Sequence, residues 1–520
     1  SSADYHHYVT PDQFRAAYGA SQQDLATAAA TLQGMGFQTR LTSQSVIAAA
    51  PQSTVERAFS VKLQVPQSHA RGTASAARAG LTANRAPALP AALTKLGATV
   101  SFAGLQYQFD SQRVSKVAFT PTPDNRYSAE GPYWFTDLKQ AYGYPSYTSA
   151  RGSGKKIAVV GSSDILDSDL AGYFGHEALT PPTVVRRPVD GGPQPFDPNS
   201  GASIEASLDV QQAFGSAPGA GIILYGVPDL SSQSVADAYA SIVEDNKADI
   251  ANSSFGLCEL YYTAAYNGGA DFTSILQVFH DIFRQGNAQG ITFVASSGDS
   301  GAYGCVDPTD SFLVKGVQNP ADDPNTTAVG GTNLITTFKN GSLASRYVRE
   351  EAFSDSFQDI PNDQFGSGGG ISVIFGKPLY QFLVNTHANT RTVPDVAMHM
   401  GGCPFGVPIC NPDDSSDVVA FGGQFFLVIG TSASSPEFAG LLAVTESHLG
   451  TRLGNANYYI YGLALLGHNA AYRMDIPGYN GYNATPGYNY VLGNGTPHAA
   501  VFAADPFAQL AGNPGTPSNP

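Results

Sequence analysis

The sequence predicts an α/β fold, and three stretches of the chain carry that prediction. Lys156 to Val160 is a short apolar strand, and a second apolar strand begins at Phe293 and runs into a Gly-rich turn. A third, residues 425–429, breaks into small residues at Gly430 and continues as an apolar helix. Short apolar runs that end in glycine and alternate with helical patterns are typical of α/β proteins.

The first hundred residues show a separate, compact α/β pattern. Helices are predicted to open after Tyr8 and to cover Asp24 to Met35 and Val55 to Ser60, with strands at Phe37 to Leu41 and Val46 to Ala50. Residues 66–90, rich in Ala, Arg, Ser and Pro, are predicted to lie on the surface. We therefore divide the chain into a first unit (1–105), a linker (106–130), a main domain (131–510) and a flexible tail (511–520).

Composition narrows the class of protein. Of the 520 residues, 42% are apolar, enough for a large core, and 13% are charged, with a net charge of −15. No stripe of Lys and Arg is present to neutralise phosphates, which argues against a nucleic-acid partner. No apolar run approaches the roughly 18 residues of a membrane span, so we expect no membrane partner. The low charge density favours a secreted protein, and because the chain opens with serine we expect that any signal peptide was removed or was never included.

Ser432 is a candidate nucleophile because it is placed where a strand ends and a helix begins. A hydroxyl there is exposed to the partial positive charge and free N–H groups of the helix N-terminus, which favour negative charge on an attacking oxygen. The alternative is a turn or N-cap serine, which is common in a chain rich in small residues. None of the ten histidines lies in a sequence context typical of a catalytic base. The base is therefore expected to be another residue type.

Two carboxylates offer that alternative. Glu205 and Asp209 are spaced i, i+4 in a segment where Ile204 and Leu208 form a helical apolar row, so both acids share one helix face. If the pair is partly buried near Ser432, one carboxyl accepts the serine proton while the other shares a proton and orients it. The other interpretation is two solvated acids on a surface helix.

Asp299 is a third acid, in the Gly-rich turn after the strand that begins at Phe293. In one interpretation, Asp299 only closes an Asx-turn. Beside a tetrahedral adduct, a protonated aspartic acid would instead donate a hydrogen bond to the oxyanion, and loss of one such donor typically slows a reaction about 100- to 1,000-fold.

The contexts of these four residues resemble the sedolisins, the serine-carboxyl peptidases. They read Ser-Ile-Glu-Ala-Ser-Leu-Asp, Ser-Ser-Gly-Asp-Ser-Gly-Ala and Gly-Thr-Ser-Ala-Ser-Ser-Pro-Glu-Phe-Ala-Gly. The likeness extends through segments at 319–332, 367–372 and 391–397, and covers about residues 130 to 505. It implies a subtilisin-like parallel sheet flanked by helices, preceded by a small α+β prodomain of ferredoxin-like, antiparallel type.

The resemblance also implies a role for each residue. Ser432 attacks the peptide carbonyl, Glu205 is the general base, Asp209 supports Glu205, and Asp299 lines the oxyanion hole. Since a model glutamate titrates near ~4.3 and a histidine near ~6.5, a glutamate base predicts activity at acid pH.

The family resemblance extends to the substrate cleft and to the zymogen. Its walls would be two backbone segments along which an extended peptide binds as an added strand, formed by Ser254, Phe255, Gly256, Ser367, Gly368 and Gly369. The first unit would be a propeptide that covers the cleft and assists folding. The linker would then contain the activation cleavage, and the partners would be protein or peptide substrates and the chain's own propeptide, on a monomer.

A calcium ion near the C-terminus is likewise implied by the family. The matching residues are Asp475, Ile476, Thr485, Gly487 and Asn489. Asn489 stands where the family has an aspartate, and the loss of one carboxylate charge is expected to weaken the site or to let it work without metal. The alternative is a Gly- and Asn-rich turn cluster that needs no ion.

The four cysteines allow three pairings, of which we favour Cys403–Cys410 with Cys258–Cys305. No Cys-x-x-Cys spacing points to zinc. The second bridge would stiffen the turn that carries Asp299.

Two other functions remain open from the sequence. The chain could be a catalytically silent binding protein, which the complete set of four polar residues argues against. It could also be a histidine-dependent protease of the subtilisin type, which the histidine contexts argue against.

Overall fold

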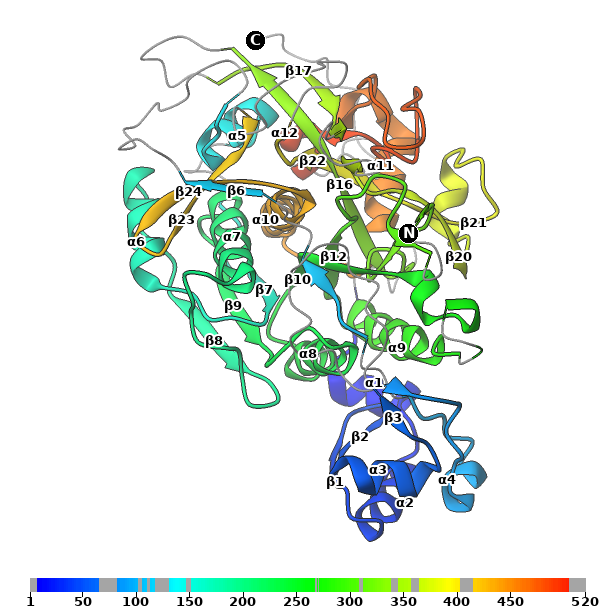
Figure 1. Cartoon of the computed structure of the whole chain (residues 1–520). Helices are drawn as coiled ribbons and strands as arrows, with labels where there is room; N and C mark the ends of the chain where they lie inside the picture. Colours follow the sequence, from blue (N-terminus) through cyan, green and yellow to red (C-terminus); the bar gives the residue numbers. More distant parts are fainter. Residues whose placement is uncertain are drawn as a thin grey trace.

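A computed structural model describes most of the chain (Figure 1). The described residues are 7–64, 82–101, 105–109, 113–116, 131–145, 151–266, 269, 271–307, 312–337, 345–356, 364–402 and 415–504. The predicted tail and much of the predicted linker, together with the proposed Cys403–Cys410 bridge, lie outside these residues.

The N-terminal domain contains the predicted helices and strands with small shifts at their ends. Thr10 caps the first helix by accepting from the Gln13 N–H while the Gln13 side chain accepts from the Thr10 N–H, and Pro11 occupies the first helical position. The strands form two separate antiparallel pairs, β1 with β2 and β3 with β4, so one ferredoxin-like sheet is not formed by the described residues. The elements are α1 Pro11–Tyr18, α2 Gln22–Gly34, β1 Gln38–Leu41, β2 Val46–Ala49, α3 Gln52–Phe59, β3 Leu63–Gln64, β4 Thr82–Ala83 and α4 Ala91–Lys95.

The main domain is built on an eight-stranded sheet that confirms the predicted subtilisin-like α/β fold. Seven strands are parallel and one edge strand, β17, runs antiparallel to β16. The order is β17-β16-β12-β10-β7-β9-β8, and β22 also pairs with β16. The strands are β7 Lys156–Gly161, β8 Val184–Pro188, β9 Gly221–Gly226, β10 Ile250–Ser253, β12 Thr292–Ser296, β16 Thr326–Thr336, β17 Tyr347–Ala352 and β22 Val396–His399.

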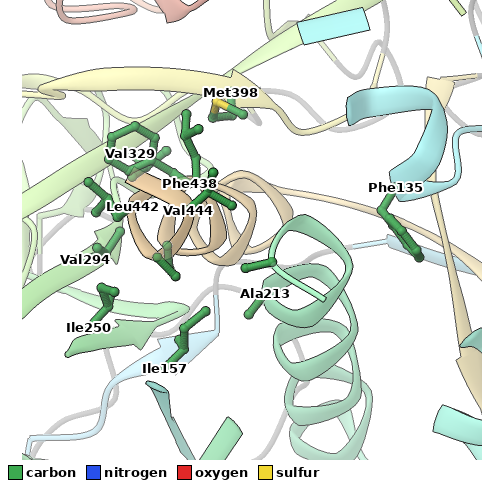
Figure 2. Close-up of a cluster of buried hydrophobic side chains, with 14 of the residues drawn as sticks. Phe135, Ile157, Ala213, Ile250, Val294, Val329, Met398, Phe438, Leu442 and Val444 are labelled. Atoms are coloured by element: carbon green, nitrogen blue, oxygen red, sulfur yellow. The ribbon is translucent and has the colours of Figure 1, made fainter. Parts of the chain in front are cut away.

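Helices cover both faces of this sheet, as expected for parallel strands that are apolar on both sides. In β7, Ile157 and Val159 pack toward one face while Ala158 and Val160 pack toward the other. The first face is covered by the buried helix α10 and by α5, α7 and α11, and Figure 2 shows residues of α5, α7 and α10 in this cluster. The second face is covered by α8 and α9 (Figure 1). The helices are α5 Phe135–Tyr142, α6 Asp167–His176, α7 Gly201–Ser216, α8 Ser232–Asp245, α9 Ser274–Ala288, α10 Thr431–Leu449, α11 Asn457–Ala471 and α12 Ala499–Ala503.

Helices α7 and α10 approach each other at Gly440. A Cβ at this position would lie 2.3 Å from the Ser216 Cβ and 2.8 Å from the Ala213 carbonyl oxygen, closer than real side chains come. Figure 2 shows Ala213 on α7 beside α10. The absence of a side chain at residue 440 therefore sets how closely the two helices pack.

Shorter strands lie around the central sheet. One three-stranded group has the order β15-β11-β5 and another the order β23-β24-β6. These strands are β5 Gln108–Phe109, β6 Arg113–Lys116, β11 Phe255–Cys258, β15 Gln318–Asn319, β23 Asp417–Phe421 and β24 Gln424–Ile429; the others are β13 Cys305–Val306, β14 Leu313–Val314, β18 Ser354–Ser356, β19 Gln364–Gly366, β20 Gly370–Gly376, β21 Thr390–Val393, β25 Tyr472–Arg473 and β26 Thr496–Pro497. Short 3-10 helices cover Glu259–Tyr262, Ala264–Tyr266 and Leu379–Leu383.

The predicted bridge between Cys258 and Cys305 is confirmed. It joins β11 to the residues that follow the Asp299 turn. Within the described parts of the chain, every helix is too short or too polar to cross a lipid bilayer.

The N-terminal domain packs against α8 and α9 through polar contacts (Figure 1). Glu244 on α8 accepts from the Ser43 N–H at 2.8 Å and from the Arg15 guanidinium at 3.1 Å. Arg40 lies 3.5 Å from Asp237 on the same helix, and Gln44 donates to the Asp281 carbonyl on α9. Charged and amide groups thus make the contact.

Candidate active site

Asp209, Asp299 and Ser432 are connected by hydrogen bonds near the carboxyl ends of two neighbouring parallel strands, and Glu205 joins them through its electrostatic interaction with Asp209. The segment after β10 carries Ser254, the turn after β12 carries Asp299, and α10 begins one residue before Ser432. Ligands of open α/β sheets bind at this edge. Glu205, Asp209, Asp299 and Ser432 are each at most 3% exposed, so they are not acids on a solvated surface.

Ser432 is held beside the segment that follows β10. Its Oγ lies 3.5 Å from the Ser254 carbonyl, to which it donates, and the Ser254 hydroxyl lies 3.4 Å from the Ser432 carbonyl. That carbonyl is open to an outside donor because Pro436, four residues later in the helix, has no N–H to offer it.

Asp209 is joined to this arrangement through Ser254. The Ser254 hydroxyl donates to Asp209 Oδ1 at 2.5 Å and also accepts from the Asn252 amide. Burial raises the pKa of Asp209 well above its ordinary value, and the nearby Glu205 carboxylate raises it further, whereas the hydrogen bonds from Ser254 and Asn252 lower it. The two acids on α7 therefore interact as a buried pair, in which burial and the neighbouring charge favour the protonated form of Asp209.

Asp299 is fixed against the first turn of the serine's helix. Its Oδ1 accepts from the Thr431 backbone N–H at 2.7 Å and from the Thr431 hydroxyl at 2.8 Å. The Thr431 hydroxyl in turn accepts from the Gly298 N–H. Asp299 thus bonds to Thr431, the residue that directly precedes Ser432.

The two predicted cleft segments have different surroundings. Phe255 and Gly256 are the first two residues of β11, and Ser254 directly precedes them. Strand β5 of the linker pairs antiparallel with β11, with Phe109 opposite Phe255 and Gln108 opposite Gly256. A peptide strand thus lies where the sequence predicts substrate.

The second segment is packed behind the Asp299 turn. The Gly368 N–H donates to the Gly298 carbonyl, and a Cβ at Gly368 would lie 2.1 Å from the Ser297 carbonyl oxygen. At Gly369 a Cβ would lie 2.0 Å from the Tyr490 carbonyl oxygen. The Ser367 hydroxyl is used internally, because it donates to the Val491 carbonyl and accepts from the Gly331 N–H.

The linker also contacts the strand that leads into the nucleophile. Backbone pairing of β6 with β24 sets Arg113 opposite Ile429 and Val114 opposite Val428. Phe109 and Arg113 are therefore held at strands that end or begin within three residues of Ser254 and Ser432.

Histidines with described contacts are engaged away from Ser432. His399 donates to the Ser415 carbonyl and accepts from the Leu334 N–H, and burial lowers its pKa to about 3. His280 faces Asp323 at 2.9 Å, and His176 faces Glu177 at 2.8 Å. These contacts disfavour a histidine base.

Two further buried carboxyls were missed by sequence reasoning. Glu437, one turn after Ser432, and Asp417 are each 1% exposed, and neither has a hydrogen bond among the described residues. Burial raises the pKa of both well above the ordinary range, and Asp417 and Glu350 raise that of Glu437 further while Lys139 lowers it. The Pro-Glu dipeptide in the apolar helix was the available signal.

The residues matched to a calcium site do not form a calcium cage. Calcium takes six to eight oxygen ligands at about 2.3–2.6 Å. Asp475 is exposed, and the carbonyls of Thr485 and Gly487 accept from the Asn489 NH₂ group at 2.9 and 3.3 Å. Across the described residues, no three His, Cys, Asp or Glu side chains gather in a metal-binding group.

Comparison with known proteins agrees with this geometry. Residues 198–510 match the Subtilase family, and residues 1–98 match the activation domain of pro-kumamolisin. The chain therefore belongs to the subtilase family.

The similar proteins are sedolisins and kumamolisins, and the matched region includes a propeptide. Sedolisin from Pseudomonas sp. (strain 101) is 33% identical over 311 residues, which cover 58% of this chain and 48% of that protein. Kumamolisin from Bacillus sp. (strain MN-32) is 28% identical over 521 residues, covering 94% and 84%. The match thus spans about half of the length of the first relative.

A solved structure shows the same fold. Pseudomonas sedolisin, a serine-carboxyl proteinase complexed with two molecules of pseudo-iodotyrostatin, aligns with a TM-score of 0.59 at 26% identity. The alignment covers 71% of this chain and 96% of that one.

Proposed function

We propose that this chain is an acid-acting serine-carboxyl peptidase made as a self-processing zymogen. The observation that carries the proposal is the contact set around Ser432, in which Ser254 links the serine to Asp209 and Thr431 links it to Asp299. A base on α7 and an acid at the oxyanion position require no histidine.

In the proposed reaction, Glu205 accepts the proton of Ser432 Oγ as the oxygen attacks the peptide carbonyl. Asp209 shares a proton with Glu205 and keeps its orientation. A protonated Asp299, together with the N-terminus of α10, stabilises the oxyanion. Glu205 then donates its proton to the leaving amine, and water releases the acyl group by the same route in reverse.

The first substrate is the chain's own linker. Because Phe109 pairs beside Ser254 and Arg113 pairs just before the nucleophile's helix, we place the processed bond between Phe109 and Arg113. This narrows the predicted region of 106–130. Residues 105–109 lie along the cleft before that bond, which is longer than a tripeptide and supports an endopeptidase over a tripeptidyl peptidase.

The test is a pH profile of casein cleavage for the wild type, Ser432→Ala and Glu205→Ala. We expect a maximum at acid pH in the wild type and loss of activity in both variants. Activity that survives in Glu205→Ala would indicate the histidine-dependent alternative, and an inert wild type at every pH would indicate a binding protein. N-terminal sequencing after exposure to acid locates the processed bond.

The same proposal includes the cellular setting. A disulfide and an acid-acting site suit an extracellular, secreted enzyme that acts on protein substrates as a monomer. Gel filtration of the processed protein and assay of the culture medium test these two points.

A further inference from the structure

Tyr107 of the linker is inserted into a closed site in the main domain. Its side chain is 2% exposed although it belongs to a connecting segment. Aromatic rings form the walls, with Phe255 of β11 at 5.5 Å and Phe279 of α9 at 6.0 Å between ring centroids, both edge-on. We call Phe255, Tyr262, Phe279 and Asn319 the Tyr107 pocket.

The floor of the Tyr107 pocket is polar and matches a phenol. The Tyr107 hydroxyl donates to Asn319 Oδ1 at 2.6 Å and accepts from the Tyr262 hydroxyl at 2.9 Å. Asn319 is oriented for this contact because its NH₂ group donates to Asp322. Both donor and acceptor functions of the phenol are therefore satisfied in a buried site.

The backbone around Tyr107 is bound as an extended peptide would be. The Tyr107 N–H donates to the Leu230 carbonyl, and the Ser232 N–H donates to the Leu105 carbonyl. The next two residues, Gln108 and Phe109, pair with β11. Residues 105–109 thus lie between the segment at 230–232 and β11, on the approach to Ser432.

We propose that the Tyr107 pocket is a specificity site that selects a tyrosine in the substrate, a few residues before the cleaved bond. This rests on the proposed peptidase function. When the linker leaves, the site retains aromatic walls and two buried polar groups. A substrate tyrosine satisfies both groups, whereas a phenylalanine removes the donor to Asn319 Oδ1 and the acceptor of the Tyr262 O–H, which a buried site penalises.

The test uses acid-processed protein and a synthetic peptide with the sequence of residues 104–116. Relative to this peptide, we expect kcat/KM to fall about tenfold when its Tyr107 is replaced by Phe and about 100-fold with Ala. Replacing the exposed Gln108 by Ala is the matched control and is expected to leave the rate unchanged. In the enzyme, Tyr262→Phe is expected to narrow the difference between the Tyr and Phe peptides.

Equal rates for the Tyr, Phe and Ala peptides would contradict the proposed specificity site but not the proposed peptidase function. If no peptide is cut, the proposed function fails, and the pocket is then tested by hydrogen exchange in the uncut Ser432→Ala chain. Tyr107→Phe is expected to speed exchange of residues 105–109 severalfold, while Gln108→Ala does not. Unchanged exchange in both would overturn it.

A second inference concerns Asn489, where the family pattern has an aspartate bound to calcium. The Asn489 Oδ1 accepts from the N–H groups of Val491 and Leu492, both at 3.0 Å. Its NH₂ group donates to the Thr485 and Gly487 carbonyls. Two donors on one side and two acceptors on the other fix the orientation of the amide, because reversing it would lose all four bonds.

We infer that the Asn489 amide replaces the calcium ion and makes this turn independent of metal. The NH₂ group satisfies two carbonyls that would otherwise be calcium ligands. A carboxylate site loses its metal as acid protonates the ligands, whereas an amide does not titrate. The replacement therefore keeps the turn ordered in acid.

The test is thermal unfolding of the Ser432→Ala chain, which stays uncut, in EDTA and in excess calcium. We expect the two melting temperatures to agree within about 1 °C. Asn489→Asp is expected to melt several degrees lower in EDTA and to be rescued by calcium, since its second oxygen faces two carbonyls. The control Asn483→Asp, which adds the same charge at an exposed site, is expected to show neither effect. Loss of stability on chelation in the unaltered turn, with calorimetric binding of one calcium, would overturn the inference.

Discussion

The N-terminal domain and the main domain differ in how much each buries. The small domain has one core of six fully buried apolar residues, Leu32, Phe37, Phe59, Val61, Ala83 and Leu93. The main domain packs large clusters on both faces of its sheet. Small domains gain less from burial, and the contacts between these two are polar, so the small domain is the part that can leave. Among the described residues, release of the small domain therefore breaks a few polar contacts of its own, and the chain must also withdraw Leu105 and Tyr107 from their buried positions.

The largest expected effect is that of Ser432→Ala on the separation of the two domains. Loss of the nucleophile is expected to lower peptidase activity by about 10⁴-fold or more, and the chain then keeps its N-terminal domain after acid treatment. Mass spectrometry of the acid-treated chain measures this directly. Ser447→Ala, at a surface serine of the same helix, serves as control and is expected to process normally. Processing at a normal rate in Ser432→Ala would show that another protease makes the cut.

The next largest expected effect is on the stability of the main domain at neutral pH. The pKa values of Glu437 and Asp417 are raised in the folded state. Their contribution to stability is therefore complete below the unfolded pKa, near ~4, and is lost as pH rises through the folded pKa. Glu437→Gln is expected to raise the melting temperature at neutral pH by about 3 °C or more and to change it little near pH 4.

Differential scanning calorimetry at several pH values measures that effect on the uncut chain. Asp167→Asn, at an exposed acid, is the matched control and is expected to follow the wild type. A parallel pH dependence for Glu437→Gln and wild type would mean that the buried carboxyls do not limit stability.

The smallest expected effect concerns a single contact between the two domains. Glu244→Gln retains an acceptor for the Ser43 N–H but removes the charge that faces Arg15. We expect the cleaved N-terminal domain to bind the main domain about three- to tenfold more weakly, because partly exposed ion pairs contribute modestly. Surface plasmon resonance with acid-separated domains measures the Kd. Asp24→Asn on α2 is the control, and an equal Kd in both variants would remove Glu244 from the interface energetics.

Sequence reasoning predicted what depends on local pattern. The spacing of Glu205 and Asp209 defined one helix face, and the glycine-rich turn located Asp299. Short helices and strands of the N-terminal domain were also readable, since capping and apolar periodicity are local. Cys258 and Cys305 were paired from their positions near two expected elements.

Features that depend on long-range contacts were not predictable. The link from Ser254 to Asp209 joins residues 45 positions apart. The sequence around Tyr107 gives no sign of its contact with Asn319, which lies 212 residues further along the chain. For Asn489 the pattern gave the position, but the direction of its hydrogen bonds requires knowing which backbone groups face it.

The close approach of α7 and α10 at Gly440 makes the proposed site sensitive to a substitution outside it. Glu205 and Asp209 belong to one helix and Ser432 to the other, and Gly440, about two turns after Ser432, is the point where the two backbones approach each other. The distance between the proposed proton acceptor and the proposed nucleophile therefore depends on a residue that has no side chain. A bulkier residue there would push the two helices apart, and it is expected to abolish the proposed activity although every proposed catalytic side chain is still present. A comparison of the polar active-site residues alone would not detect such a substitution.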